Sequence, residues 1–78
     1  MKQINVRCTE SFQEFNRGNL ICEVYEGEVL LADLYIESEE YFATDSKGRE
    51  VYVGKINFNR KIELEDCFEL IGGVTDGQ

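Results

Sequence analysis

The chain has 78 residues and a mass of 9.0 kDa, with no proline, tryptophan or histidine and a net charge of −8 at neutral pH. This length allows one domain with a thin core, and no apolar stretch approaches the roughly 20 residues that span a bilayer. We expect a single β-rich domain over residues 1–73 and a flexible tail over residues 74–78. The first residues lack the apolar stretch of a secretory signal, so we expect a cytoplasmic protein.

The acidic charge is concentrated in one part of the sequence. Residues 18–46 carry eight acids and no base, whereas residues 47–61 carry five bases and one acid. The overall charge disfavours binding to nucleic acid or to an anionic membrane, because both interactions need Lys and Arg. Two interpretations remain. Either the acids cover ordinary solvated faces, or the base-free segment presents an acidic surface to a basic protein.

The N-terminal part predicts one strand and one less regular element. Apolar and polar residues alternate over residues 2–9, which is typical of a half-buried strand. Residues 11–14 then have the Ser-x-x-Glu form of a capping box, and Gly18 can end a helix. This combination predicts a short helix or a structured loop.

Two β-rich runs follow, over residues 20–25 and 29–36, with Glu26-Gly27-Glu28 between them. A glycine-containing break between such runs predicts a hairpin. The second run is apolar on both faces except at Asp33, so we expect the core to cover one face and a partner or another element to cover the other. Asp33 is then either a buried, charge-paired carboxylate or an outward acid on an edge strand that hinders aggregation.

The segment Asp45-Ser46-Lys47-Gly48 predicts the best-defined hairpin of the chain. It lies between residues 41–44 and residues 51–56, and Asp first with Gly fourth is typical of a type I turn leading into a bulge. Gly54 predicts a bend or bulge, beyond which Ile56 and Phe58 continue one face.

The last apolar stretch, residues 62–71, fits two structures. Four of its apolar residues fall on one helical face, but Phe68-Glu69-Leu70 alternates and favours a strand.

Residue types needed for common enzyme chemistry are missing. Without histidine the chain has no Ser-His or Cys-His nucleophile pair, and it has no glycine-rich phosphate-binding motif. Cys8, Cys22 and Cys67 are widely spaced and lie beside apolar residues, so we interpret them as buried and unbridged rather than as zinc ligands. We therefore expect no catalytic residues, no metal and no cofactor.

Over about two thirds of the chain, the order of features resembles that of small SH3-like β-barrels. The resemblance is carried by Phe15 and Gly18 before the first long strand, by Tyr41-Phe42-Ala43-Thr44 leading into the Asp/Gly turn, and by Phe68-Glu69-Leu70 at the end. It implies a mainly β fold, a small antiparallel sheet or SH3-like barrel of five to six strands with at most one short helix. In size and charge alone, the chain also resembles phage-encoded acidic inhibitors such as anti-CRISPR and anti-restriction proteins.

These observations favour a non-enzymatic, acidic protein-binding module that masks the basic, nucleic-acid-binding surface of a partner protein. Carboxylates would take the places of phosphates, with Glu26 and Glu28, and Glu37 and Glu39, presenting charge rows along strands. The alternative is an assembly domain whose apolar strand 29–36 docks on a like or unlike subunit, for example as a homodimer. The candidate partner-binding residues are Glu23, Tyr25, Glu26, Glu28, Asp33, Tyr35, Glu37, Glu39 and Glu40.

Overall fold

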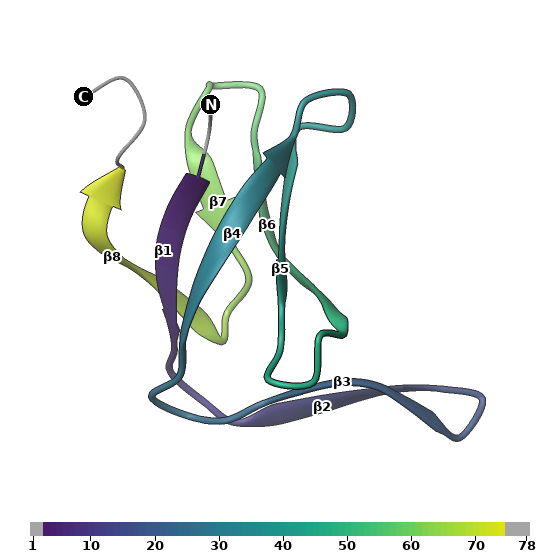
Figure 1. Cartoon of the computed structure of the whole chain (residues 1–78). Helices are drawn as coiled ribbons and strands as arrows, with labels where there is room; N and C mark the ends of the chain where they lie inside the picture. The colour runs from purple at the N-terminus through teal and green to yellow at the C-terminus, as the bar shows by residue number, and fades with distance from the viewer. Residues whose placement is uncertain (1–2, 75–78) are drawn as a thin grey trace.

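The computed structural model describes residues 3–74, and within that range the chain forms eight strands and no helix. Six strands make one antiparallel sheet in the order β7-β6-β5-β4-β1-β8, and the other two make a separate sheet (Figure 1). The mainly β prediction is therefore confirmed. The strands are β1 (Gln3–Cys8), β2 (Phe12–Asn16), β3 (Asn19–Val24), β4 (Val29–Tyr35), β5 (Glu40–Thr44), β6 (Glu50–Ile56), β7 (Ile62–Leu64) and β8 (Phe68–Val74).

The six-stranded sheet curls until its two end strands, β7 and β8, approach one another. The result is a small, nearly closed barrel that is compatible with the SH3-like fold. Its interior is filled by one face of each long strand, because residues two apart on a strand point the same way. The fully buried or nearly buried apolar residues are Ile4, Val6, Cys8, Cys22, Val24, Leu30, Ala32, Tyr41, Ala43, Val51, Val53 and Phe68.

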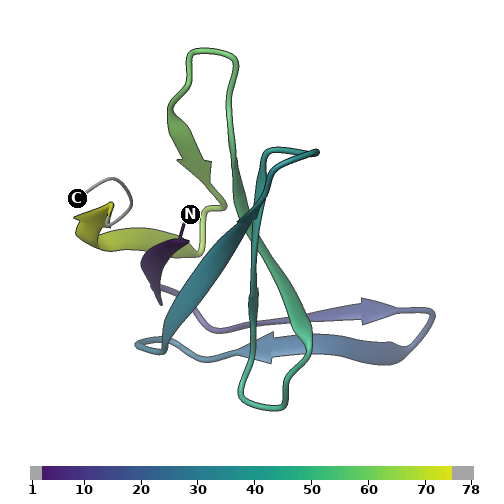
Figure 2. The same ribbon diagram turned by 45° about the horizontal axis from the view of Figure 1, so that its top comes forward.

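Strands β2 and β3 form an arm that projects from one end of the barrel (Figure 2). The prediction of a short helix or structured loop that starts at residues 11–14 and ends at Gly18 was wrong, because residues 12–16 pair with β3. Arg17 and Gly18 both have positive φ angles, 55° and 83°, between the paired residues Asn16 and Asn19. Two such residues make the tight turn that suits a two-residue hairpin, and cross-strand bonds then outcompete a single helical turn.

The expected hairpin between residues 20–25 and 29–36 was also wrong. These runs became β3 and β4, which belong to different sheets: β3 pairs with β2, and β4 pairs with β1 and β5. The break between them is a β-turn in which the Glu28 amide donates to the Tyr25 carbonyl at 3.0 Å. The end of β1 holds this turn in place, because Gly27 donates to the Cys8 carbonyl and Cys8 donates to the Glu28 carbonyl.

The hairpin of β5 and β6 is confirmed. The Gly48 amide donates to the Asp45 carbonyl at 2.9 Å, and Gly48 has a φ of 79°. The bulge beside Gly54 is confirmed as well, since Tyr41 lies opposite Gly54 while Phe42 lies opposite Tyr52.

Residues 62–71 contain strands rather than a helix, as the alternation favoured. The prediction that Phe58 continues one face of the strand with Ile56 was wrong. Phe58 lies in the turn before β7 and is 93% exposed. The Asn57 side chain accepts hydrogen bonds from the amides of Asn59 and Lys61, which closes this turn and directs Phe58 outward. Residues 75–78 of the expected tail lie outside the described part of the chain.

Candidate protein-binding surface

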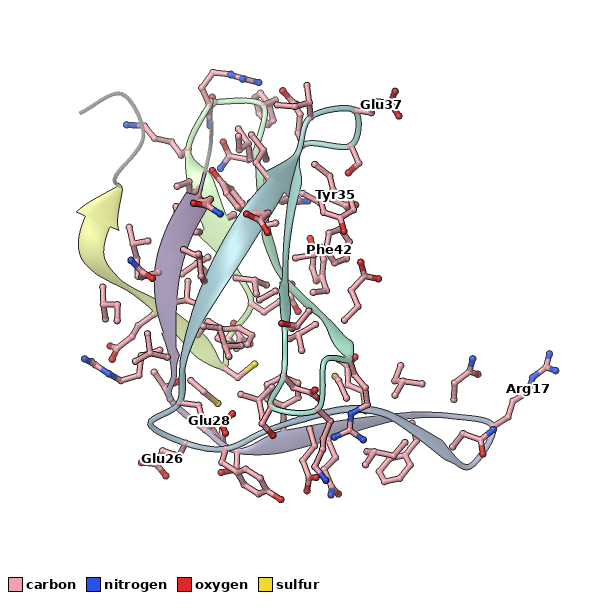
Figure 3. The ribbon with its side chains drawn as sticks, viewed as in Figure 1. Arg17, Glu26, Glu28, Tyr35, Glu37 and Phe42 are labelled. Atoms are coloured by element: carbon pink, nitrogen blue, oxygen red, sulfur yellow. The ribbon has the colours of Figure 1, made fainter. Side chains whose placement is uncertain are left out.

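The nine sequence-predicted binding residues do not form one surface. Glu26 and Glu28 lie at the end of the barrel that carries the arm, whereas Glu37 lies at the opposite end, with Tyr35 between them (Figure 3). The structure therefore separates the residues into three groups. The arm-end group is Glu23, Tyr25, Glu26 and Glu28; the β4 group is Asp33 and Tyr35; and the far-end group is Glu37, Glu39 and Glu40.

The expected charge rows were wrong, because four of these acids lie in turns. Glu26 and Glu28 flank Gly27 in the turn between β3 and β4, and Glu37 and Glu39 lie in the turn between β4 and β5. A turn does not repeat its side-chain direction every two residues, so the spacing that holds on a strand does not apply.

Acids of the far-end group lie near bases from the basic segment of the chain. The Arg60 guanidinium donates to the Glu39 carboxylate and forms an ion pair at 2.7 Å. Glu40 lies directly across from Lys55 on the neighbouring strand. The base-free stretch in the sequence is therefore not free of bases in space.

In the arm-end group, Tyr25 contacts two other predicted residues, Glu23 and Glu28, and its amide donates to the Glu28 carboxylate at 3.3 Å. The Tyr25 hydroxyl donates to the Glu23 carboxylate at 2.6 Å, and the Gln13 side-chain amide donates to the same carboxylate at 2.7 Å. Both bonds favour the charged carboxylate, so they lower the pKa of Glu23, and the same Tyr25 bond raises the pKa of Tyr25. A shallow depression of about 330 Å³ beside them is lined by Ser11, Phe12, Gln13, Glu23 and Tyr25.

The outward face of β4 is exposed, so no other element among residues 3–74 covers it, and cover by a partner stays a prediction. Val29, Leu31 and Tyr35 are each about half exposed, and they point away from the core beside Asp33. Asp33 is outward, but β4 is an interior strand of the sheet between β1 and β5. The edge-strand interpretation was therefore wrong, and so was the buried one. The Gln3 side chain donates to the Asp33 carboxylate at 2.6 Å.

Aromatic rings from three adjacent strands gather on this outward face. Tyr35 and Phe42 have ring centroids 4.8 Å apart, and Phe42 and Tyr52 have centroids 5.5 Å apart. Figure 3 shows Tyr35 and Phe42 side by side on the outside of the barrel. We call this surface the outer-face patch and define it as Leu31, Asp33, Tyr35, Phe42, Thr44, Glu50 and Tyr52.

Two carboxylates lie within the patch, and none of its residues is Lys or Arg. Asp33 stands directly opposite Phe42 in the register of β4 and β5, and the Tyr35 hydroxyl donates to Glu50 at 3.2 Å. The pKa of Tyr35 is raised first by this hydrogen bond and then by the charges of Glu50 and Asp33. The patch is thus apolar in the middle and negative around it.

A further carboxylate, Asp45, serves the fold. Its side chain is fully buried and accepts hydrogen bonds from the amides of Lys47, Arg49 and Glu23, and from the Arg49 guanidinium at 2.8 Å. Burial alone would raise the pKa of Asp45, but the combined hydrogen bonds outweigh it and lower the pKa to about 2. Because Glu23 is on β3, this carboxylate ties the arm to the turn between β5 and β6.

Sequence reasoning missed Phe42, Tyr52 and Glu50, because it followed the acidic segment. The structure shows why both rings point outward: Phe42 lies between buried Tyr41 and Ala43, and Tyr52 lies between buried residues of β6. The sequence predicts only that Tyr41 and Phe42 face opposite ways, not which of them faces the core.

These observations define a small, nearly closed β-barrel with an aromatic and acidic outer face. Among residues 3–74, no group of His, Cys, Asp and Glu could hold a metal ion, and no helix could cross a membrane. The three cysteines are free, with Cys8 and Cys22 buried and Cys67 partly buried. No protein-family model, curated protein or solved structure matches the chain.

Proposed function

We propose that the chain is a non-enzymatic protein-binding module whose outer-face patch binds a basic site on another protein. The supporting observation is the cluster of three aromatic rings on an exposed sheet face, accompanied by Asp33 and Glu50 and by no cation within the patch. Aromatic residues are enriched at interfaces, where they supply contact area at low entropic cost. Carboxylates beside them select a partner that offers Arg or Lys.

The net charge of −8 supports the same kind of partner. A strongly acidic protein attracts a basic surface over long range and speeds encounter, and this attraction weakens with salt. The acids at the two ends of the barrel would contribute to that attraction, while the patch would make the short-range contacts. In its more specific form, we propose that the module is an inhibitor. It covers a surface of the partner that otherwise binds nucleic acid, as an anti-restriction or anti-CRISPR protein would.

The test is capture of proteins from a cell lysate by three immobilised chains. The first is wild type, the second carries Asp33→Lys and Glu50→Lys, and the third carries Glu26→Lys and Glu37→Lys as a matched change of charge outside the patch. We expect wild type to enrich basic proteins at low salt, and to lose most of them when the Debye length falls from about 10 Å to about 3 Å. The patch variant should lose them at low salt, whereas the control should lose far fewer.

Equal capture by wild type and the patch variant would overturn the proposal, and so would capture that is indifferent to salt. For the inhibitory form, a captured nucleic-acid-binding protein should release its nucleic acid in proportion to added module. A stable ternary complex would rule out competition.

The exposed face of β4 also favours a second function, assembly with a like or unlike subunit. Val29, Leu31 and Tyr35 form an outward row that is about half exposed, and such a row can pack face to face against another sheet. The mass in solution separates the two functions. A dimer that Leu31→Asp dissociates would favour assembly, whereas a monomer in both cases would favour the basic partner.

A further inference from the structure

The outer-face patch contains a hollow whose size suits a single side-chain head group. The hollow has a volume of about 130 Å³ and is lined by Leu31, Asp33, Tyr35, Phe42, Ala43, Thr44 and Glu50. Ligand pockets for drug-sized molecules are usually about 300–1,000 Å³, and one water occupies about 30 Å³ of liquid. The hollow is therefore too small for a cofactor or a folded segment, but it has room for a group of a few heavy atoms.

The walls of this hollow combine ring faces with carboxylates on two sides. The rings of Tyr35 and Phe42 are tilted by 52° to one another rather than stacked flat, and both line the hollow. Asp33 reaches the hollow from β4, where it lies opposite Phe42, and Glu50 reaches it from β6, where it lies opposite Thr44. The Tyr35 hydroxyl holds Glu50 beside its own ring by the 3.2 Å hydrogen bond.

We infer that this hollow binds the guanidinium group of an arginine side chain from the partner protein. A guanidinium is planar and weakly hydrated, so it stacks on an aromatic face while the N–H groups around its edge donate to carboxylates. Asp33 and Glu50 reach the hollow from β4 and β6, on opposite sides of β5, which matches an occupant that donates in more than one direction. An ammonium group also has several N–H donors, but it is not planar, so it cannot stack flat on a ring while it donates in this way. This inference rests on the proposed function and names the contact at its centre.

The test uses the whole 78-residue chain and three small probes, followed by nuclear magnetic resonance. The probes are Nα-acetyl-arginine amide, the lysine counterpart, and Nα-acetyl-citrulline amide, in which a neutral urea of nearly the same shape replaces the guanidinium. A single exposed side chain binds weakly, so titrations extend through the millimolar range. We expect the arginine probe to shift the ring resonances of Tyr35 and Phe42 and the amide of Thr44 along one saturating curve. The lysine probe should bind more weakly, and the citrulline probe should not saturate.

Two double variants then test whether the carboxylates of the hollow bind the arginine probe. Asp33→Asn with Glu50→Gln should weaken the arginine probe by roughly threefold to tenfold, because two ion pairs are lost. Glu26→Gln with Glu37→Gln removes the same charge at the two ends of the barrel and should leave the affinity within about twofold, because neither carboxylate lines the hollow.

Several outcomes would overturn the inference: citrulline binding as well as arginine, lysine binding more tightly than arginine, or shifts centred outside the hollow. These outcomes leave the proposed function intact if the lysate experiment still shows patch-dependent capture of basic proteins. Conversely, if the arginine probe binds in the hollow but capture does not depend on the patch, the proposed function falls.

Discussion

Replacing Asp45 by Asn should destabilise the protein strongly, because the carboxylate joins the arm to the barrel. Its side chain is fully buried and accepts from three backbone amides and one guanidinium. The pKa of Asp45 falls from 3.8 to about 2, which corresponds to about 2 kcal/mol of preference for the charged form in the folded state. In the Asn variant, an amide N–H₂ group also replaces one of the two carboxylate oxygens. This group cannot accept hydrogen bonds, so it faces N–H donors that lose their acceptor. We expect the free energy of unfolding to fall by about 2–4 kcal/mol in total.

Urea unfolding followed by far-ultraviolet circular dichroism measures this loss, since the chain has no tryptophan. With a slope of about 1 kcal/mol per molar urea, the midpoint should fall by about 2 M or more. The matched control is Asp66→Asn, at an exposed position in the turn before β8, which should change the midpoint little.

The pH dependence of the stability difference between wild type and Asp45→Asn reports on the charge of Asp45 alone, because the other carboxylates are the same in both proteins. Because the folded-state pKa lies below the ordinary value, the stabilisation is complete above about pH 4 to 5 and is lost as the pH falls towards 2. The difference between wild type and Asp45→Asn should therefore narrow by about 1 kcal/mol between pH 7 and pH 3. If the difference is the same at both pH values, or no larger than that of the control, the assigned role of this carboxylate is wrong.

Three further predictions concern glycines and thiols. Gly54→Ala should lower the free energy of unfolding by about 1–3 kcal/mol in urea titrations, because an added Cβ would lie 2.5 Å from a backbone oxygen of β7; an unchanged midpoint would contradict the close approach of β6 and β7. Gly48→Val should cost about 1–3 kcal/mol by the same measurement, because the φ of 79° is strained for a branched residue, and an equally stable variant would argue against the assigned turn. Burial raises the pKa of Cys8, and it raises the pKa of Cys22 and of Cys67 to about 11. A disulfide reagent at pH 8 should therefore react far more slowly with the native chain than with the denatured chain. Equal rates would contradict the burial of these thiols.

Local signals in the sequence were enough to predict the β class and one hairpin. Alternation marked β1, and the Asp45 to Gly48 turn carries its own chemistry, since Gly is needed for the positive φ and Asp suits the first turn position. Gly54 signalled the bulge for a similar reason. These features depend on residues that lie within a few positions of each other.

Strand partners and the binding surface could not be predicted in the same way. The residues of β2 fit a capping box and a strand equally well, and only pairing with β3 decides between them. The Glu26-Gly27-Glu28 turn looks like a hairpin turn, but it connects two sheets, and this arrangement depends on β1. For the site, the base-free segment was a misleading guide, because Arg60 and Lys55 return to it through the sheet.

The pairing of β1 with β8 brings the first and last described strands together, since Ile4 lies opposite Val74. Closing this pair during folding must restrict a loop of about the whole chain, which is entropically costly and characteristic of slow folding. A circular permutant would join the two ends by a short linker and open the chain at Phe58 and Asn59, in an exposed turn. The same sheet order should form, with the five-pair contact of β1 with β8 made local and the smaller, three-pair contact of β6 with β7 made long-range instead. We expect the permutant to fold faster than the natural chain in stopped-flow experiments, and an equal or slower rate would indicate that the first and last strands meet only after the rate-limiting step.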